Sequence, residues 1–273
     1  MNSNAKILVC THKQFNYIAD DSFLPIHVGK EISNLDLPYQ SDNEGENIST
    51  KNKSFCELTA LYWAWKNLKY PNYVGLCHYR RFFDFSTIKK NNTLEEISEN
   101  YFLENFNNYI FEDHIIQGFD IILSKPLTKT RSLFSHYSKS HRNEDFDVLH
   151  ATINELYPDY INSFHKIMNK NNKLSPFNMF IANQEFLFNY STWLFTILEA
   201  VEKRISISEN QYQQRVIGFM SERLLNVYVY HHNLKVKYLP VHFIADKTKR
   251  KSLLVKKLID INNNILFYFR EKF

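Results

Sequence analysis

Two arginines and a histidine follow a short apolar segment in the first third of the chain. Residues 73–77, Tyr-Val-Gly-Leu-Cys, have the length and the aromatic and β-branched character of a buried strand. His78, Arg80 and Arg81 come directly after it. Ligands of open α/β sheets bind outside the carboxyl ends of strands, and a guanidinium holds phosphate oxygens in a permanently charged fork. The motif therefore predicts a diphosphate site, with solvated arginines at a strand end as the alternative.

A second polar group follows the first apolar segment of the chain. Residues 6–11 predict a buried strand that ends at Thr11, and His12 and Lys13 come next. The loop after a first strand commonly seats a nucleotide. We therefore treat these three residues as candidate nucleotide contacts, although ordinary loop polarity explains them equally well.

A capping box predicts that a helix begins at Ser54. Ser54 and Glu57 form the pattern S-x-x-E ahead of an apolar stripe at helical spacing. The polar loop before it contains Asn47 and Asn52. The N-terminus of a helix favours an anion because its N–H groups are free and its dipole is positive there. Asn47 and Asn52 are therefore further candidate nucleotide or diphosphate contacts.

Predicted strands and helices alternate along the chain, without a repeat or an evident linker. This order predicts an α/β fold in one domain, residues 1–246, followed by a basic tail, residues 247–273. Further strands are predicted at 25–29, 118–123, 176–182 and 235–240. Helices are predicted at 93–109, 144–168, 183–201 and 211–230, with a break at Pro158 in the second and an Asn183 cap on the third.

Composition excludes several functional classes. The 273 residues include only 5 glycines and contain neither G-x-G-x-x-G nor G-x-x-x-x-G-K-[ST], which disfavours Rossmann and P-loop sites. The three cysteines lack metal-ligand spacing and predict buried thiols in a reducing compartment. No secretory leader and no run of about 18 apolar residues is present, so we expect a cytoplasmic protein.

The positive charge is concentrated in the tail. Residues 247–273 hold eight Lys or Arg against Asp260 and Glu271, a net +6, whereas the whole chain has +4. The remainder is therefore slightly acidic, which argues against nucleic acid as a partner. Leu258, Ile261 and Ile265 belong to an apolar stripe in this tail. A basic amphipathic helix of this kind either lies on an anionic membrane surface or packs on the domain, and the sequence favours neither.

Carboxylates that could hold a divalent ion or act as a base are few. The single D-x-D, Asp145-Phe-Asp147, begins a predicted helix instead of ending a strand, so no metal site is predicted there. Cationic side chains can neutralise a departing diphosphate without a metal, and dependence on a divalent ion stays open. Candidate general bases are Glu222, His141 and Asp145. For Glu222 a structural ion pair is an equally good explanation, and for His141 a hydrogen bond to substrate.

Several of these motifs resemble a bacterial family of capsular-polysaccharide and lipopolysaccharide glycosyltransferases long catalogued as a domain of unknown function. The two longest matching strings are E-L-T-A-L-Y-W-A-W-K-N at 57–67 and G-L-C-H-Y-R-R at 75–81. Shorter matches are Thr-His-Lys at 11–13, the loop 47–52, Asn-Met-Phe-Ile at 178–181, Trp-Leu-Phe at 193–195, and 215–224.

The resemblance implies a GT-A-like nucleotide-sugar-binding fold, with a mixed, mainly parallel sheet flanked by helices. It also implies transfer of a sugar from a nucleotide donor to a growing surface glycan, whereas donor, acceptor and anomeric outcome differ among members. We expect a hexosyltransferase that uses a UDP-sugar and acts on a capsule or lipopolysaccharide glycan. Asn178 would then line the acceptor side, and Glu222 with Arg223 would face the cleft. The alternatives are a nucleotide-sugar hydrolase or phosphotransferase, and a non-enzymatic glycan-binding module.

Overall fold

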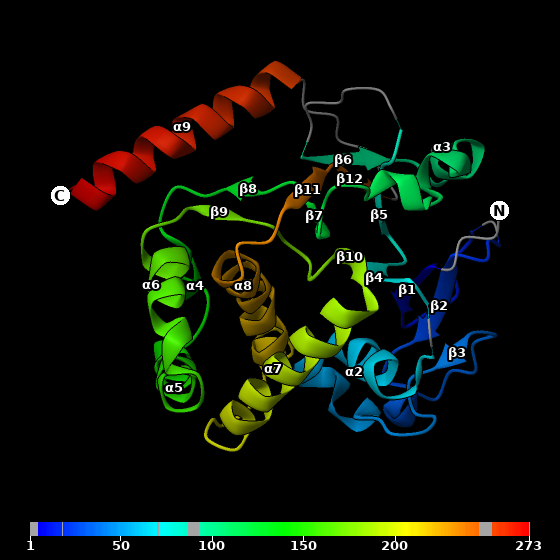
Figure 1. The fold of residues 1–273 in the computed structure, drawn as a ribbon, viewed down its shortest axis with the longest axis horizontal. Helices are drawn as coiled ribbons and strands as arrows, with labels where there is room; N and C mark the ends of the chain where they lie inside the picture. Colours follow the sequence, from blue (N-terminus) through cyan, green and yellow to red (C-terminus); the bar gives the residue numbers. More distant parts are fainter. Residues whose placement is uncertain (1–4, 18, 70, 87–92, 246–252, 273) are drawn as a thin grey trace.

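The computed structural model describes residues 5–17, 19–69, 71–86, 93–245 and 253–272 (Figure 1). One mixed sheet forms its centre, with the strand order β11-β7-β10-β4-β1-β2-β3. The strands of this path are β1 (Ala5–Thr11), β2 (Phe23–His27), β3 (Gln40–Ser41), β4 (Tyr73–His78), β7 (Ile121–Ser124), β10 (Phe180–Asn183) and β11 (Val236–Leu239).

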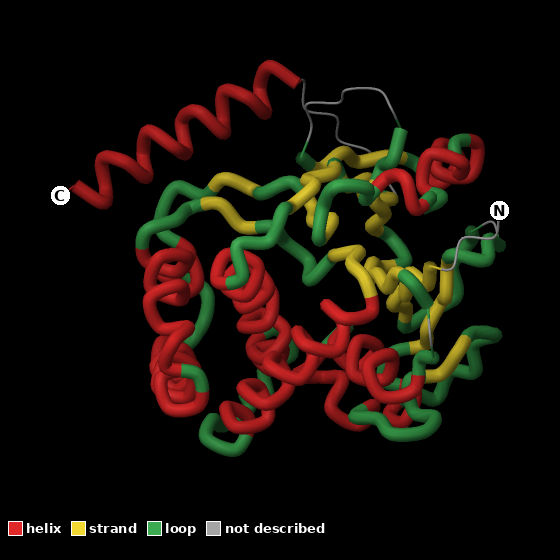
Figure 2. Tube along the Cα trace, in the orientation of Figure 1, coloured by secondary structure: helices red, strands yellow, loops and turns green. Residues whose placement is uncertain are grey.

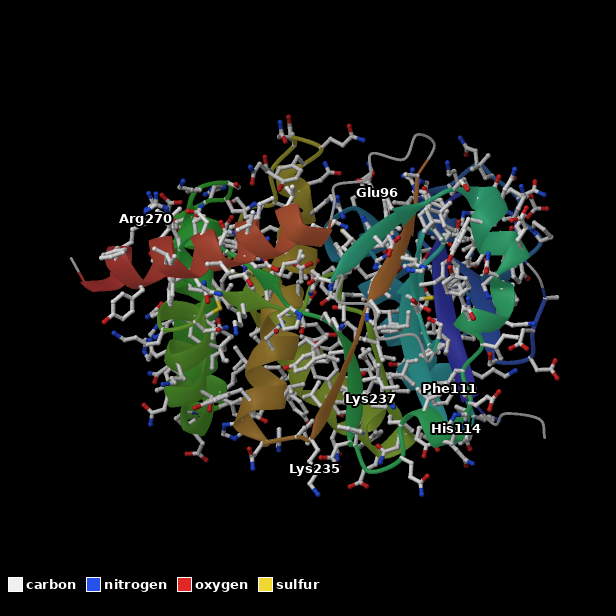
Figure 3. The ribbon with its side chains drawn as sticks, turned by 90° about the horizontal axis from the view of Figure 1, so that it is seen from above. Glu96, Phe111, His114, Lys235, Lys237 and Arg270 are labelled. Atoms are coloured by element: carbon white, nitrogen blue, oxygen red, sulfur yellow. The ribbon has the colours of Figure 1, made fainter. Side chains whose placement is uncertain are left out.

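Parallel pairs dominate the centre of this sheet. β1 pairs in parallel with both β2 and β4, β2 with β3, and β7 with β11, whereas β10 runs antiparallel between β4 and β7. The edge strand β11 carries Lys237 and follows Lys235 (Figure 3). Lysines on an edge strand discourage pairing with another chain. The arrangement confirms the predicted α/β fold with a mixed, mainly parallel sheet.

Both faces of the sheet are buried, as expected for parallel strands. On β1, Leu8 and Cys10 belong to one apolar core, and Ile7 and Val9 belong to the other. The larger core includes residues of the helices, and the smaller one includes residues of a short mixed layer of strands and of a short helix. Figure 2 shows most of the helices on one side of the strands. The helices of the larger core are α2 (Leu58–Asn67), α4 (Leu133–Ser138), α5 (Asn143–Leu156), α6 (Ile161–Asn169), α7 (Gln184–Glu202) and α8 (Val216–His231).

The smaller core is rich in aromatic rings. Phe82 and Phe102 lie 4.5 Å apart between ring centroids, and Tyr109 lies 4.9 Å from Phe102. The elements around these rings are β5 (Arg81–Phe83), β6 (Leu94–Ile97), β12 (Val241–Ile244) and α3 (Glu99–Glu104). β12 pairs with both β5 and β6. Aromatic side chains therefore make up much of the smaller core.

The structure corrects two of the predicted helices. The helix expected at 93–109 begins instead as strand β6, and only α3 and a 3-10 turn follow it. The capping box at Ser54 is also wrong. Ser54 donates its hydroxyl to the Lys51 carbonyl, and Glu57 caps nothing with its side chain.

The helix expected to begin at Ser54 is broken because the backbone of Cys56 has φ 53° and ψ −130°, outside the helical region. The short α1 (Asn52–Phe55) therefore ends one turn after it begins, and α2 starts afresh. By contrast, the predicted Asn183 cap of α7 is confirmed, since its Oδ1 accepts a hydrogen bond from Phe186 N at 2.8 Å.

The C-terminal helix α9 (Leu253–Lys272) lies beside the small antiparallel pair of β8 (Leu127–Thr128) and β9 (Lys173–Leu174), as Figure 1 shows. The basic residues at 247–251 lie outside the described residues. None of the helices in the described part of the chain is long and apolar enough to cross a membrane.

Candidate functional site

A cavity of about 510 Å³ opens at the carboxyl ends of β1, β2 and β4. The parallel registers bring these ends together, because Cys10 pairs with His78 and Thr11 pairs with His27. The junction of α1 and α2 and the first turns of α8 close the other side. Ligands of open α/β sheets bind in this position, so the cavity is the candidate site.

Permanent positive charges outnumber carboxylates around this cavity. The cations are Lys53, Arg80, Arg81 and Arg215, and the carboxylates are Glu57 and Glu222. Such an excess suits a ligand with about two negative charges, and guanidinium groups bind phosphate oxygens in a bidentate way. The cavity is therefore complementary to a diphosphate.

A tight hairpin presents the two neighbouring arginines. β4 turns into β5 through Tyr79 and Arg80, and His78 pairs directly with Arg81. Aromatic faces hold both guanidinium groups: the carbon of Arg81 lies 4.6 Å from the ring centroid of Phe177, and that of Arg80 lies 5.2 Å from that of Tyr79. Burial lowers the pKa of Arg81 from its usual value. An anion would offset that cost.

The opposite wall is a strained turn at Phe177 and Asn178. Their φ angles are 76° and 54°, in the left-handed region that non-glycine residues rarely adopt. Three side chains from other elements hold this turn. Glu222 accepts a hydrogen bond from Phe177 N at 2.6 Å, Glu57 accepts one from Asn178 Nδ2 at 2.7 Å, and His78 Nε2 lies 2.9 Å from the Phe177 carbonyl. We call this arrangement the turn clamp.

The turn clamp fixes the state of His78. A carbonyl oxygen only accepts, so the His78 Nε2 must carry the proton that it donates to Phe177. Burial lowers the pKa of His78, and the positive charge of Arg81 lowers it further, against the opposing effect of Glu57. A neutral His78 with Nε2–H satisfies the turn and leaves Nδ1 as an acceptor.

The close approach of α8 to the α1–α2 junction sets the depth of the cavity. A Cβ atom at Gly218 would lie 3.1 Å from Cys56 Sγ, tighter than ordinary contact. Arg215 Nε donates to the same sulfur at 3.3 Å. Burial and the nearby Glu57 raise the pKa of Cys56 to about 12, so the thiol is neutral. Cys56 therefore acts as a packing residue that helps to place Arg215.

The structure gathers six of the residues singled out in the sequence around the cavity. These are His12, Asn52, His78, Arg80, Arg81 and Glu222. Asn178 is buried directly behind the wall as part of the turn clamp. Its role is thus to shape the site, and its Oδ1 has no hydrogen-bond partner among the described residues.

Three nucleotide candidates lie outside the lining of the cavity. Thr11 is buried and bonds with Lys13 through its hydroxyl, and the ammonium of Lys13 lies 5.4 Å from the Tyr79 ring centroid. Asn47 donates to the carbonyls of Asn43 and Gly45, which ties its own loop together.

The remaining candidates lie near α8 but outside the lining of the cavity. Arg223 is 3% exposed, and its guanidinium carbon lies 5.0 Å from the ring centroid of Tyr137. His141 packs at a tilt against Phe219, with 4.3 Å between ring centroids, and Asp145 is buried near Arg142. None of these three lines the cavity. Successive helical residues point about 100° apart, which explains why Glu222 faces the cavity and Arg223 does not.

Sequence reasoning missed Glu57 as a site residue. It was interpreted as part of a capping box, whereas its carboxylate lines the cavity and holds Asn178. In the part of the chain that the structure describes, no group of three or more His, Cys, Asp or Glu side chains could hold a metal ion.

Comparison with known proteins adds a family to this geometry. The solved apo structure of WbbM, described as a bifunctional glycosyltransferase, superposes with a TM-score of 0.80 at 32% sequence identity. The match covers 91% of this chain but 47% of that protein, so the chain spans about half of its length. No curated protein matches the chain. The model of the family described as "Domain of unknown function (DUF4422)" matches residues 6–233, and the chain belongs to that family.

Proposed function

We propose that this protein is a glycosyltransferase that moves a sugar from a nucleotide donor to a growing surface glycan. One observation carries the proposal: the Arg80–Arg81 hairpin and the carboxylate of Glu222 face the same cavity at the strand ends. Cations for a leaving diphosphate and a carboxylate for an acceptor hydroxyl are the two groups that such a transfer needs. The likeness to one half of WbbM supports it. We further propose a hexosyl donor and an acceptor of the capsule or lipopolysaccharide type, at the cytoplasmic face of the membrane.

The donor would lie with its diphosphate between the arginines and the start of α8. Arg80 and Arg81 would bind it from the hairpin, and Arg215 from the opposite side. His12 and Asn52 line the cavity beside the ends of β1 and β2, where the nucleoside of a UDP-sugar would lie.

Removal of either hairpin arginine should weaken the binding of UDP. A hydrogen bond to a charged group contributes about 1.5–3 kcal/mol, so we expect Arg80→Ala and Arg81→Ala each to raise the Kd of UDP by about 10- to 100-fold. Isothermal titration calorimetry measures this directly. Arg204→Ala is the matched control, because Arg204 pairs with Glu155 on the surface outside the cavity. Unchanged affinity in both hairpin variants would rule out the diphosphate site.

Glu222 is the carboxylate best placed to take a proton from an acceptor hydroxyl. It is part of the cavity wall, whereas His141 and Asp145 are not. Its Oε1 holds Phe177 N, and Oε2 lies 3.6 Å from Arg223 Nη1. We propose it as the general base of an inverting transfer.

Glu222→Gln should separate this role from the turn clamp. Glutamine keeps an acceptor for Phe177 N–H but is not basic, so we expect kcat to fall by about 10²- to 10⁴-fold while UDP still binds. Asp145→Asn and His141→Asn should each retain most of the wild-type kcat. Steady-state kinetics of radiolabelled sugar transfer measure these kcat values. A larger loss of kcat in Asp145→Asn or His141→Asn than in Glu222→Gln would contradict the assignment.

We also propose that the transfer does not require a divalent metal. Four permanent cations around the cavity can neutralise the diphosphate that leaves. We therefore expect turnover in EDTA to equal turnover in Mn²⁺ or Mg²⁺ within about twofold. A complete loss of activity in EDTA that added metal restores would show that the cations do not suffice.

The C-terminal helix supports a peripheral contact with an anionic bilayer. Lys256 and Asn263 donate to the carbonyls of Leu94 and Thr128, and Asn264 accepts from Asn172. The polar side of α9 is therefore the side that faces the protein.

The opposite side of α9 is apolar and faces solvent. Leu258, Ile261, Ile265 and Phe269 are 64, 55, 49 and 56% exposed, and their spacing of three and four residues places them on one stripe. The sequence 247–257 carries six Lys or Arg and no acid. Exposed apolar side chains next to basic ones favour the surface of an anionic bilayer.

Polar substitutions in this stripe should release the protein from vesicles. Burial of one such side chain contributes about 1.5–3 kcal/mol, so Ile261→Ser with Ile265→Ser should reduce co-sedimentation with phosphatidylglycerol vesicles at least about tenfold. Ile32→Ser with Leu35→Ser is the matched control, since both are exposed elsewhere. Unchanged co-sedimentation of the α9 variant would contradict a membrane role for this helix. So would a wild-type dimer that dissociates in the α9 variant but not in the control, because the stripe would then be a dimer interface.

A further inference from the structure

A second group of basic side chains, two cations and one imidazole, lies near Glu222 but outside the lining of the cavity. We call Lys129, His136 and Arg223 the cationic cluster. Lys129 follows β8, His136 lies in α4, and Arg223 follows Glu222 in α8. They are electrostatic neighbours, because the charges of Lys129 and Arg223 both act on His136.

The cationic cluster has donors that no protein group satisfies. Arg223 is buried, and Nη1 donates to the Phe219 carbonyl at 2.7 Å, but Nε has no partner among the described residues. The same holds for His136 Nδ1 and for the hydroxyl of Tyr137, on whose ring Arg223 lies. Buried donors without acceptors are costly. Such a site is completed by an acceptor from outside the chain.

The positive charges of the cationic cluster also call for an anion from outside the chain. Burial lowers the pKa of His136 to about 4, with further lowering by Lys129 and Arg223, and burial also lowers the pKa of Lys129. Glu222 is the carboxylate beside the cluster, with Oε2 3.6 Å from Arg223 Nη1 and Oε1 accepting from Phe177 N, whereas Asp145 Oδ2 lies 3.9 Å from Arg142 Nε. One carboxylate therefore faces the two permanent cations Lys129 and Arg223. His141 adds a further imidazole near Arg223. Like charges that lower one another's pKa gain from an anion between them.

An anion can reach the cationic cluster because part of it is open. Lys129 and His136 are only partly buried, and the Lys129 ammonium makes no hydrogen bond or ion pair within the described ranges. The backbone beneath is held in place, since Lys129 N donates to Asn172 O at 2.8 Å and Asn172 Nδ2 donates to Lys129 O at 2.9 Å.

We propose that the cationic cluster binds an oxyanion, a carboxylate or a phosphate, carried by the acceptor glycan. This rests on the proposed function, since it assigns the cavity to the donor and the cationic cluster to the acceptor. The charge of Glu222 acts on both Arg81 and Lys129. An acceptor held by its acidic group would present a hydroxyl to that carboxylate, and neutral glycans would be poorer acceptors.

The titration of His136 tests this without any measurement of turnover. Protein labelled with 15N-histidine is titrated in inorganic phosphate and in chloride of equal ionic strength, with His136→Asn to assign the resonance. We expect phosphate to raise the pKa of His136 by about one unit or more, because a bound anion favours the imidazolium. Glucuronate and glucose serve as an acidic and a neutral sugar, and glucose should have no effect.

Two variants decide whether the cationic cluster is responsible for the effect of phosphate on the pKa of His136. The difference in the pKa of His136 between phosphate and chloride should vanish in Lys129→Gln and in Arg223→Gln. Because Lys129 is partly exposed, we expect Lys129→Gln to fold. UDP should still bind to Lys129→Gln. The proposal would be overturned if phosphate raised the pKa of His136 equally in Lys129→Gln, or did not raise it in the wild type. A response that saturating UDP abolishes would also overturn it, because the phosphate would then lie in the donor cavity. Failure of UDP to bind at all would instead count against the proposed function alone.

Discussion

The turn clamp is the interaction on which the candidate site depends. Phe177 and Asn178 both adopt left-handed backbone angles, which cost free energy in residues other than glycine. Hydrogen bonds offset that cost: Glu222 and Glu57 accept from the turn, and His78 donates to it. These three side chains come from α8, from the start of α2 and from the end of β4, so one turn ties together three elements that are distant in sequence.

The turn clamp also sets the electrostatics of the cavity. It holds both cavity carboxylates in place by hydrogen bonds, and their two charges are outnumbered by those of Arg80, Arg81, Arg215 and Lys53. The ring of Phe177 supports the guanidinium of Arg81. Glu222 belongs at once to the cavity and to the helix that carries Arg223. Glu222 therefore links the cavity to the cationic cluster, since its charge acts on both Arg81 and Lys129.

The sequence predicted the parts of this arrangement that depend on local pattern. Apolar runs identified β1, β4 and β7, and strand-end reasoning placed His78, Arg80 and Arg81 at the site. Arg81 itself turned out to lie on β5, because the hairpin after β4 reverses the chain within two residues. A two-residue turn without glycine, asparagine or aspartate lacks the usual signal.

The parts that could not be predicted depend on long-range partners. Glu57 matched a capping box, but the backbone of Cys56 leaves the helix and turns that carboxylate toward Asn178, 121 residues away. The left-handed pair at Phe177 and Asn178 is equally invisible in sequence, since bulky residues rarely adopt that conformation. In both places tertiary contacts override local preference. They coincide with the candidate site, where strain of this kind commonly occurs.

The central claim is that the clamped cavity holds a nucleotide diphosphate against the Arg80–Arg81 hairpin. A crystal structure of the protein with a bound UDP-sugar tests it most directly. We expect both phosphates within hydrogen-bond distance of the hairpin guanidinium groups, with the sugar directed toward Glu222 and the Phe177–Asn178 turn unchanged. A nucleotide bound elsewhere, or a diphosphate held away from both arginines, would contradict the claim.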